Sequence, residues 1–462
     1  MLERNGDCIE GMMKSSRYNL FLDIEEGKKL AFNGVSAALA EIEADKFPII
    51  QKILDDPSSA ETAEEKSLFS ALRHGKYLID GDTDELTALK VRSRRQRFSK
   101  NAYLLTIAPT LACNLKCDYC FVSQQAVRMS QETEKALLRF KESDLRRSDS
   151  LAITWFGGEP TLCPDTIERL QDGYHELCSR YRVELHPSGI VTNGYLLDAA
   201  MASRLQQAGV VNAQITLDGP REVHDARRKQ HNGKGTFDRI IDNIGTSVDK
   251  LRISVRVNVD RDNINSTLEL MDYLDSRKIL RSVAVNFAQV LVSQGVCSDM
   301  RENCFSEEEY AKEQLRLYRT LIDHGYDQIS YPNPAGGGAC AAGADNGWVV
   351  SPSGDLFKCW EEISADQSSS VGSVFDLKQD PRQKANLDRY LGWDPFEKPG
   401  CVKCDILPLC MGGCPQQALK IDSKEEGACC SWKYNLKEML ILRYLCDQLQ
   451  ARKRTDSGSR LP

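Results

Sequence analysis

The middle of the chain alternates between strand-like and helix-like patterns, and this alternation constrains the fold more than any other feature. Apolar runs are separated by amphipathic helical patterns, which indicates βαβ units and a parallel sheet. Six units predict a partial (β/α)6 barrel, a TIM-like α/β fold with its chemistry at the carboxyl ends of the strands. The predicted strands are 104–108, 151–156, 184–191, 212–217, 252–259 and 282–290, with helices at 131–142, 165–180, 197–208, 237–248 and 263–275.

Three cysteines, Cys113, Cys117 and Cys120, follow the first predicted strand in the segment TLACNLKCDYCF. Thiolates this close together in one loop can hold three irons of a [4Fe–4S] cluster and leave the fourth iron without a protein ligand. A small molecule can bind at that open iron and accept an electron. Buried thiols or a zinc site are the alternatives.

The spacing CxxxCxxC, with the aromatic Tyr119 before the last cysteine, resembles the signature of the radical S-adenosylmethionine (SAM) enzymes. These enzymes carry a GGE-like motif one βα unit later, where this chain has Gly157, Gly158 and Glu159. Glycines let the backbone approach a ligand closely, and the carbonyls and the acidic group would bind the ammonium of the methionine. The resemblance implies that the three-cysteine loop is catalytic. It would split SAM to a 5′-deoxyadenosyl radical, which takes a hydrogen atom from an unactivated carbon.

Polar side chains lie at the ends of the later predicted strands, in VTNG and ITLDGP, and suit ribose hydroxyls or a substrate backbone. The segment DGPREVHDARR resembles a stretch of sulfatase-maturing and peptide-modifying relatives in which an arginine pairs with the SAM carboxylate. That match implies Arg228, and arginine suits a bidentate carboxylate contact; an ion pair at a helix start is the alternative. The candidates for cofactor binding are Thr192, Asn193, Thr216, Asp218 and Arg228 in these segments, and Asn258 at the end of the fifth predicted strand.

The third part of the chain is rich in predicted loops and in cysteine, including the spacing Cx2Cx5Cx3C. It resembles the SPASM extension, which binds two auxiliary [4Fe–4S] clusters and would bring the total to three. Zinc is the main rival, because four cysteines also suit zinc. The resemblance assigns Cys401, Cys404, Cys410 and Cys430, preferred over Cys429, to one cluster, and Cys340, Cys359 and Cys414 to the other.

The second of these sets has only three obvious protein ligands. A substrate thiolate, a serine, an acidic side chain or Cys429 could complete it. Anaerobic sulfatase maturases carry an aspartate, which serves as general base, directly after the equivalent of Cys359. This chain has Trp360 there, with Glu361 and Glu362 displaced by one and two residues. The departure counts against a sulfatase maturase and agrees better with relatives that modify ribosomal peptides.

The first part of the chain predicts three short strands, at 18–23, 28–33 and 37–42, and then two helices, at 47–54 and 63–73. Such a module suits a winged-helix fold and resembles the leader-peptide recognition domain of peptide-modifying systems; a structural cap is the alternative. A basic stretch, 90–100, is expected to be a linker. The predicted domains are therefore 1–92 (peptide recognition), 93–334 (radical SAM barrel) and 335–462 (SPASM).

The bulk composition excludes several classes of protein. The net charge of -7 argues against general nucleic-acid binding. No apolar run approaches the roughly 18 residues needed to cross a bilayer, and the N-terminal segment lacks a secretory signal pattern. We therefore expect a cytoplasmic protein with no membrane contact, in which the 17 cysteines do not form a disulfide framework. Those with motif spacing are expected to serve metal sites, and the others are expected to be ordinary buried or surface thiols.

Together these features predict a radical SAM/SPASM maturase that binds a Cys-rich precursor peptide with a leader. An electron donor such as flavodoxin or ferredoxin would be its redox partner. The preferred product is a thioether crosslink of the sactipeptide or ranthipeptide kind, between a cysteine sulfur and a carbon of an acceptor residue. Carbon–carbon or carbon–oxygen crosslinking, epimerisation and formylglycine generation in sulfatases are the enzymatic alternatives. An iron–sulfur electron carrier is the non-enzymatic one, although a carrier needs no SAM pocket.

Overall fold

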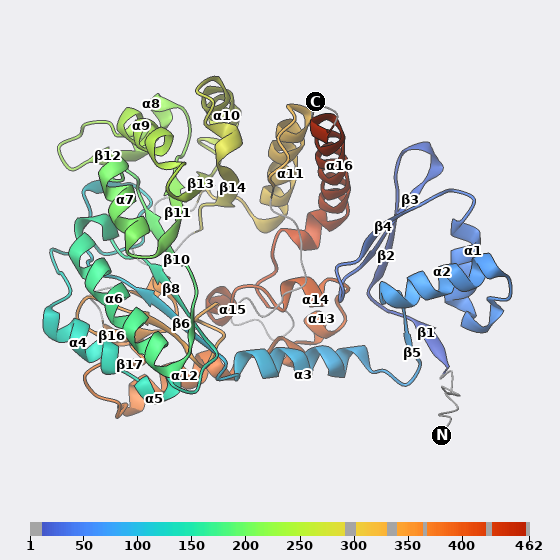
Figure 1. The fold of residues 1–462 in the computed structure, drawn as a ribbon, viewed down its shortest axis with the longest axis horizontal. Helices are drawn as coiled ribbons and strands as arrows, with labels where there is room; N and C mark the ends of the chain where they lie inside the picture. Colours follow the sequence, from blue (N-terminus) through green and yellow to red (C-terminus); the bar gives the residue numbers. More distant parts are fainter. Residues whose placement is uncertain (1–11, 292–301, 330–339, 364–366, 422–426, 459–462) are drawn as a thin grey trace.

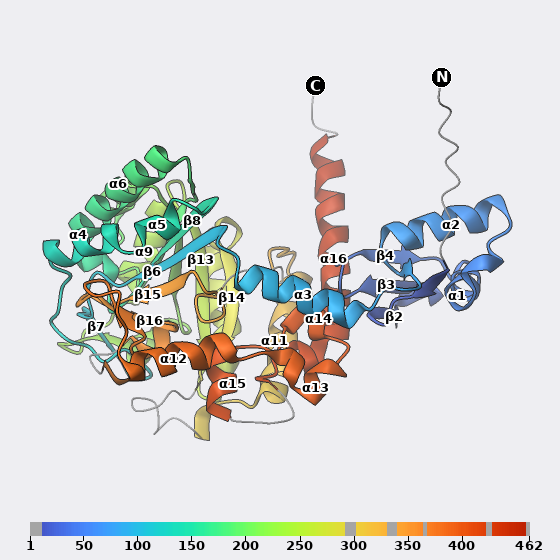
Figure 2. The same cartoon turned by 90° about the horizontal axis from the view of Figure 1, so that it is seen from below.

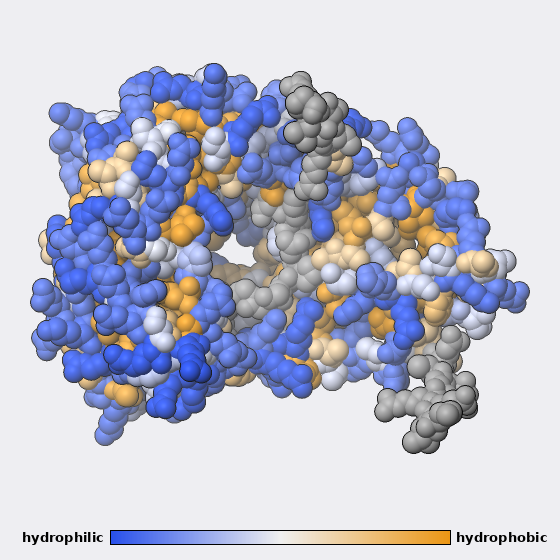
Figure 3. Space-filling model, in the orientation of Figure 1, coloured by the Kyte–Doolittle hydropathy of each residue, from blue (hydrophilic) through white to orange (hydrophobic). Residues whose placement is uncertain are grey.

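The computed structural model describes residues 12–291, 302–329, 340–363, 367–421 and 427–458. The barrel forms one half of the molecule, and the N-terminal module lies at the opposite end (Figure 1). The long helix α3 (Glu85–Arg97) connects them along one side (Figure 2). Between the two halves the surface is hollowed, as Figure 3 shows.

The barrel half contains the parallel sheet that the sequence predicts. In the described residues, six parallel strands follow the order β14-β13-β11-β10-β8-β6. Along β13 the side chains alternate between buried and partly exposed, because one face is covered by helices and the other faces the open barrel interior. The strands are β6 (Ala102–Ile107), β8 (Ser150–Trp155), β10 (Ser188–Thr192), β11 (Val210–Thr216), β13 (Arg252–Val259) and β14 (Ala284–Gln289).

The helices between these strands lie where the periodicity places them, and their apolar sides join one continuous core with the strands. Leu105, Ile153, Ile215 and Val255 are representative core residues, each almost completely buried. The prediction of a mixed α/β fold with a parallel sheet is thus confirmed. The helices are α4 (Gln131–Arg139), α5 (Glu142–Leu145), α6 (Pro164–Tyr181), α7 (Ala199–Gln207), α8 (Arg221–Arg227), α9 (Phe237–Ser247) and α10 (Thr267–Ser276), with a short strand β9 (Glu184–Leu185) beside β8.

The third part of the chain adds strands to the same sheet, which the sequence analysis did not predict. Strand β15 (Gly347–Val350) pairs in parallel with β6, and β16 (Asp355–Phe357) and β17 (Gly372–Ser373) follow in antiparallel order. All four residues of β15 are buried. The sheet therefore continues across the predicted boundary at residue 334.

Two long helices cover the other end of the third part. Helix α11 (Glu307–Asp323) packs against α16 (Trp432–Gly458), and the Asn435 side chain donates a hydrogen bond to the carbonyl of Ala311 at 2.9 Å. No helix in the described part of the chain is both long enough and apolar enough to cross a membrane. The remaining short helices of this part are α12 (Pro381–Gly392), α13 (Pro399–Val402), α14 (Leu407–Cys410) and α15 (Pro415–Ile421).

The N-terminal module has the three strands and two helices that the sequence predicts. Strands β2, β3 and β4 form an antiparallel sheet, and a separate pair joins β1 to β5. A capping box at Thr62 and Glu65 starts α2. The elements are β1 (Met13–Ser15), β2 (Asn19–Asp23), β3 (Lys29–Asn33), β4 (Leu39–Ile42), α1 (Phe47–Asp55), α2 (Ala63–His74) and β5 (Leu78–Asp80).

The basic stretch at 90–100 is not an extended linker, since most of it lies in helix α3. Asp84 caps this helix by accepting a hydrogen bond from the Thr87 amide at 3.1 Å. Arg94 contacts the Asp394 carboxylate at 2.8 Å, and Arg97 donates to the carbonyls of Gly343 and Leu391. These arginines therefore attach the helix to the third part of the chain.

Candidate active site

The cysteine loop is held at the carboxyl end of β6 by a small two-stranded sheet. Strand β7 (Leu115–Cys117) pairs antiparallel with β12 (Arg228–Gln230), and the register places Cys117 opposite Arg228. Leu115 is fully buried, which fixes the loop against the barrel. Cys113, Cys117 and Cys120 all line one cavity of about 230 Å³.

The two glycines after β8 are required by close backbone packing. The Gly158 amide donates to the carbonyl of Thr110 at 3.0 Å, and the Glu159 amide donates to that of Ala112 at 2.8 Å. A Cβ at Gly158 would lie 2.2 Å from the Ala112 oxygen, so no larger residue fits. Gly157, with φ of +121°, and Gly158 both line the cavity. The turn thereby sets the position of the segment that leads into the cysteine loop.

Glu159 is completely buried and is not among the residues that line the cavity. Its carboxylate accepts hydrogen bonds from the Thr161 amide and hydroxyl, the Thr192 hydroxyl at 2.7 Å and the Asn193 amide at 2.7 Å. Burial raises the pKa of this carboxyl, and the hydrogen bonds oppose that shift. Its carboxylate holds the end of β10, where Thr192 and Asn193 line the cavity, and a contact of Glu159 with the ammonium of SAM stays a prediction.

Tyr119 is the centre of a buried polar network. Its hydroxyl donates to the Asp218 carboxylate and accepts from Arg228 Nη1 at 2.5 Å and from Asn258 Nδ2 at 3.2 Å. The Asp218 carboxylate also accepts a hydrogen bond from Arg227 Nε at 3.4 Å. Asp218 does not line the cavity, whereas Tyr119, Arg228 and Asn258 do.

Two residues of this network escaped the sequence analysis. Arg227 lies between the carboxylates of Asp218 and Asp260, with its Nη1 2.8 Å from Asp260. Arg256, on β13, lines the cavity and donates from Nε to Asn258 at 2.8 Å. The adjacent pair of arginines in HDARR was the signal for Arg227, but the sequence does not say which of the two faces the cavity.

Arg228 has unused capacity for a ligand. It is almost fully buried, and its Nε has no hydrogen-bond partner among the described residues. A buried unpaired N–H costs about 1–3 kcal/mol unless a partner arrives. Thr216 lies on the same cavity from the end of β11. The site therefore presents a guanidinium edge and hydroxyl and amide groups to one small polar molecule.

The third part of the chain also reaches this cavity. Trp360 and Glu361, in a short helical turn (Trp360–Glu362) directly after Cys359, both line it. In the sequence, Trp360 differs from the aspartate of sulfatase maturases, but nothing there places it at the cavity. Local sequence gave no signal that this turn, some 240 residues after the cysteine loop, meets it in space.

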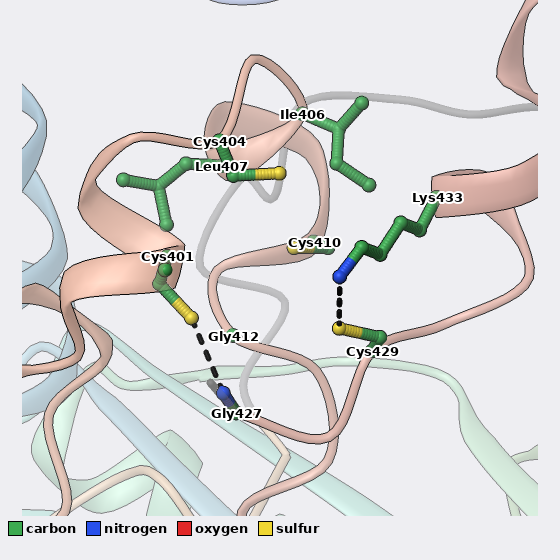
Figure 4. A pocket seen from close by; sticks show the side chains of 10 residues that line it. Cys401, Cys404, Ile406, Leu407, Cys410, Gly412, Gly427, Cys429 and Lys433 are labelled. Carbon is green, nitrogen blue, oxygen red and sulfur yellow. Dashed lines mark hydrogen bonds between the residues drawn. The ribbon is translucent and has the colours of Figure 1, made fainter. Parts of the chain in front are cut away.

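A second set of cysteines surrounds a separate cavity near the N-terminal module. Cys401, Cys404, Cys410 and Cys429 line it together, and Figure 4 shows their sulfurs around one space. The Gly427 amide donates a hydrogen bond to the Cys401 sulfur at 3.3 Å, and Lys433 Nζ donates one to the Cys429 sulfur at 3.4 Å (dashed lines in Figure 4). Such donors favour thiolates.

The sequence predicts Cys430 rather than Cys429 as the last ligand of this set, and that choice stays a prediction. Cys429 lines the cavity and Cys430 does not, but the Cys430 thiol hydrogen-bonds that of Cys410, which does line it. Both cysteines therefore lie beside the set.

Cys359 and Cys414 are close enough to Cys340 for its charge to act on both. Burial is the main cause that raises the pKa of each thiol, and the charge of Cys340 adds to it. Lys358, fully buried beside Cys359, donates from Nζ to the carbonyls of Ala344 and Gly347, and burial lowers its pKa to about 7. The sequence-predicted set is thus brought into one region.

Across the described ranges, no three Cys, His, Asp or Glu side chains are close enough to hold a single metal ion.

Comparisons with known proteins agree with the fold. Residues 107–274 match the model of the Radical SAM superfamily. Among curated proteins, Fe-coproporphyrin III synthase of Methanosarcina barkeri is 29% identical over 51% of this chain and 56% of its own length, so this chain spans little more than half of that relative. Mycofactocin maturase MftC of Mycolicibacterium smegmatis is 28% identical over 67% of this chain and 77% of its own. Radical SAM cyclopropyl synthase TigE of Paramaledivibacter caminithermalis is 20% identical over 94% and 98%.

Among solved structures, native anSMEcpe with bound AdoMet and Cp18Cys peptide superimposes with a TM-score of 0.58 at 19% identity. The match covers 75% of this chain and 99% of that one. At this identity the likeness shows a shared fold.

Proposed function

Because residues 107–274 match the model of the Radical SAM superfamily, we propose that this chain is a radical SAM enzyme that crosslinks a ribosomal precursor peptide. The single observation that carries the proposal is the cavity that Cys113, Cys117 and Cys120 share with Arg228. The similarity to mycofactocin maturase MftC and to PqqA peptide cyclase of Rhodopseudomonas palustris supports a peptide as the class of substrate.

The residues of the cavity fit a [4Fe–4S] cluster and SAM. The three cysteines would hold the cluster, and the unpaired Nε of buried Arg228 suits the carboxylate of an amino acid. The other groups that would hold SAM are Tyr119, Gly157, Gly158, Thr192, Asn193, Thr216 and Asn258. Bound together, the two groups supply one-electron cleavage of a carbon–sulfur bond and hydrogen-atom abstraction from an unactivated carbon.

The protein itself positions the groups that line the cavity and encloses the space between them. The network of Tyr119 and Asp218 fixes Arg228, and Glu159 fixes the end of β10, so both sides of the cavity are held without a ligand. Phe156, Val290 and their neighbours line the cavity with apolar surface, which would shield a reactive intermediate from side reactions.

A cavity in the N-terminal module supports leader-peptide recognition. It has about 410 Å³ and lies between β5 and α3, with Arg73, Lys76 and Arg92 among its lining. Nε and Nη2 of Arg92 are buried without a hydrogen-bond partner in the described part of the chain. The pair β1–β5 forms a two-stranded sheet, to which an extended peptide could add a strand. An acidic, extended leader fits these features.

For the product we propose a thioether between a substrate cysteine and a carbon of an acceptor residue. The set Cys340, Cys359 and Cys414 supports it, because a cluster on three protein thiolates leaves one iron for a substrate thiolate. The second candidate is carbon–carbon crosslinking, favoured by the end-to-end match with cyclopropyl synthase TigE. Trp360, in place of an aspartate, disfavours formylglycine generation.

Alkylation separates these products. After co-expression with the peptide encoded beside its gene, a thioether removes two hydrogens and leaves that cysteine unreactive to iodoacetamide. A carbon–carbon link also removes two hydrogens but leaves the thiol reactive. Oxidation to formylglycine would remove the thiol without a link between residues.

The proposal is tested by cleavage of SAM. We expect the full chain, reconstituted anaerobically with iron, sulfide, SAM and dithionite, to release 5′-deoxyadenosine. Replacing Cys113, Cys117 and Cys120 by alanine should abolish the release, since the thiolates of this loop would hold the reacting cluster. Cys178→Ala, at a buried cysteine in α6, is the control and should leave it intact. Cleavage by the triple variant would reject the site, and no cleavage by the parent chain would favour an electron carrier.

Peptide recognition is tested at Arg92. We expect Arg92→Ala to weaken binding of the labelled precursor peptide at least about tenfold in fluorescence anisotropy, because a hydrogen bond to a charged group contributes roughly 1.5–3 kcal/mol. Arg95→Ala, at an exposed position of the same helix, is the matched control. Equal affinities of the two variants would make the module a structural cap.

A further inference from the structure

The active cavity has two unlike walls. Polar groups come from the ends of β10, β11 and β13 on one side of the sheet order. The other side, where β8, β6 and β15 lie, contributes mainly rings and aliphatic groups. The residues of this apolar wall are Phe121, Val122, Phe156 and Trp360. Val290 and Leu291, after β14 at the other end of the sheet order, also line the cavity.

Three aromatic rings of this wall form a continuous stack. The Phe121 and Phe156 rings lie 6.2 Å apart at 13°, and the Phe156 and Trp360 rings lie 5.0 Å apart at 15°. Each ring comes from a different segment: the cysteine loop, the end of β8 and the turn after Cys359. Phe156 is 8% exposed, whereas Trp360, which ends the stack, is 41% exposed. Within the described residues no further ring stacks on Trp360.

A second feature of the cavity lacks a partner. Gln289, the last residue of β14, lines the cavity, and its Nε2 donates to Glu307. Its Oε1 is buried and has no hydrogen-bond partner in the described part of the chain. A buried acceptor of this kind is satisfied by an O–H or N–H donor from a ligand. The cavity thus offers a flat aromatic surface together with one unused acceptor.

We infer that Trp360 and Gln289 select the substrate side chain: an aromatic ring with a polar hydrogen, that of tyrosine or tryptophan. The ring stacks on the indole of Trp360, and its O–H or N–H donates to Gln289 Oε1. Parallel offset stacking is a favoured geometry for aromatic pairs, and the stack already holds the Trp360 ring in place. This inference rests on the proposed function, which supplies the peptide.

The position of the polar wall indicates that the Trp360 ring is not needed to bind SAM. Thr216 lies on β11 and Asn258 on β13, away from β8 and from the turn after Cys359. Arg228 starts β12, which pairs with β7 of the cysteine loop. A small polar molecule bound there leaves the indole face for a second ligand. The aromatic specificity is therefore separable from SAM binding by mutation.

The test uses the full chain, reconstituted with iron and sulfide, and two short probes, Ac-Gly-Tyr-Gly-amide and Ac-Gly-Leu-Gly-amide. Saturation-transfer NMR in the presence of SAM measures their dissociation constants. We expect the tyrosine probe to bind roughly three- to tenfold more tightly than the leucine probe, which is the range of one aromatic pair. Trp360→Ala should remove this preference and Trp360→Phe should retain most of it. Gln289→Leu should remove the preference for tyrosine over phenylalanine in the same tripeptide.

Phe375→Ala, at an exposed ring outside the cavity, is the matched control and should leave the preference unchanged. Equal binding of the two probes to the parent chain, or a preference retained by Trp360→Ala, would overturn the inference. So would a comparable loss of SAM affinity in Trp360→Ala, because the indole would then serve the cofactor. Failure of the proposed function is a different result, namely no release of 5′-deoxyadenosine while the probe preference persists.

Discussion

His224 illustrates how one buried residue supports the site from outside the cavity. Its Nδ1 accepts the Asp218 amide at 3.4 Å, and its Nε2 lies 3.1 Å from the Thr236 hydroxyl. That hydroxyl donates to the carbonyl of Arg228 at 2.7 Å. The neutral imidazole thus fixes the backbone of both Asp218 and Arg228.

This role predicts a pH dependence of stability. Burial, and then the charges of Arg228 and Arg227, lower the pKa of His224 well below 6.5. The unfolded chain takes up a proton below about pH 6.5 that the folded chain refuses, so stability is lost as the pH falls. We expect the free energy of unfolding to fall by up to about 1.4 kcal/mol per pH unit from this residue.

Denaturant unfolding between pH 7 and pH 5 measures this loss. His224→Gln should be less stable than the parent at pH 7 and should lack this part of the slope. His186→Gln, at an exposed histidine, is the control and should keep the parental slope. Parallel pH profiles for the parent and His224→Gln would contradict the assignment.

At the scale of elements, helix α3 and strand β15 connect parts of the chain that the sequence separates. Arg97 of α3 donates to Gly343 just before β15 and to Leu391 at the end of α12. Burial lowers the pKa of Arg97, and the carbonyls compensate for the lost water. The helix therefore holds β15 against β6, and with it the turn that brings Trp360 to the cavity.

We expect Arg97→Ala to destabilise this region by about 1–3 kcal/mol, because it leaves buried carbonyls without a donor. Amide hydrogen exchange should increase in β15 and β16 in particular. Arg95→Ala, on the exposed side of the helix, should stay within about 0.5 kcal/mol of the parent. Equal amide hydrogen exchange in the two variants would indicate that α3 only connects the two halves and does not stabilise β15.

At the scale of the whole molecule, the N-terminal module packs on the second cysteine set. Tyr18 and Leu89 share a core with Cys401 and Leu407. Leu30 and Phe32 share another with Leu409 and Leu440. The module proposed to recognise the peptide is thereby attached to the segment proposed to bind a cluster, and the hollow in Figure 3 lies between this half and the barrel.

This arrangement predicts the iron content. Three clusters give about twelve irons per chain. Replacing Cys401 and Cys404 by alanine should lower the content to about eight and, since both residues lie beneath the module, should also lower its thermal stability. Cys430→Ala should reduce the iron, whereas Cys429→Ala should not. Iron assay with atomic emission checks both, and about four irons in the parent chain would contradict the auxiliary clusters.

The sequence by itself determined the features that depend on short-range pattern. The alternation of the barrel predicted six parallel strands, and the spacing of Cys113, Cys117 and Cys120 predicted one shared site, because neighbours in sequence remain neighbours in space. The tips at Thr192, Asn193 and Thr216 followed from the rule that carboxyl ends of parallel strands meet.

Only the tertiary structure decided which residues from distant segments face the cavity. The hydrogen bonds of Glu159 to the end of β10, the choice between Arg227 and Arg228 and the position of Trp360 at the cavity all depend on packing between segments far apart in the chain. Four buried residues at 347–350 make β15 a strand of the barrel because β6 offers an unpaired edge, and no local pattern records that edge. Pairing and burial across such distances are properties of the folded whole.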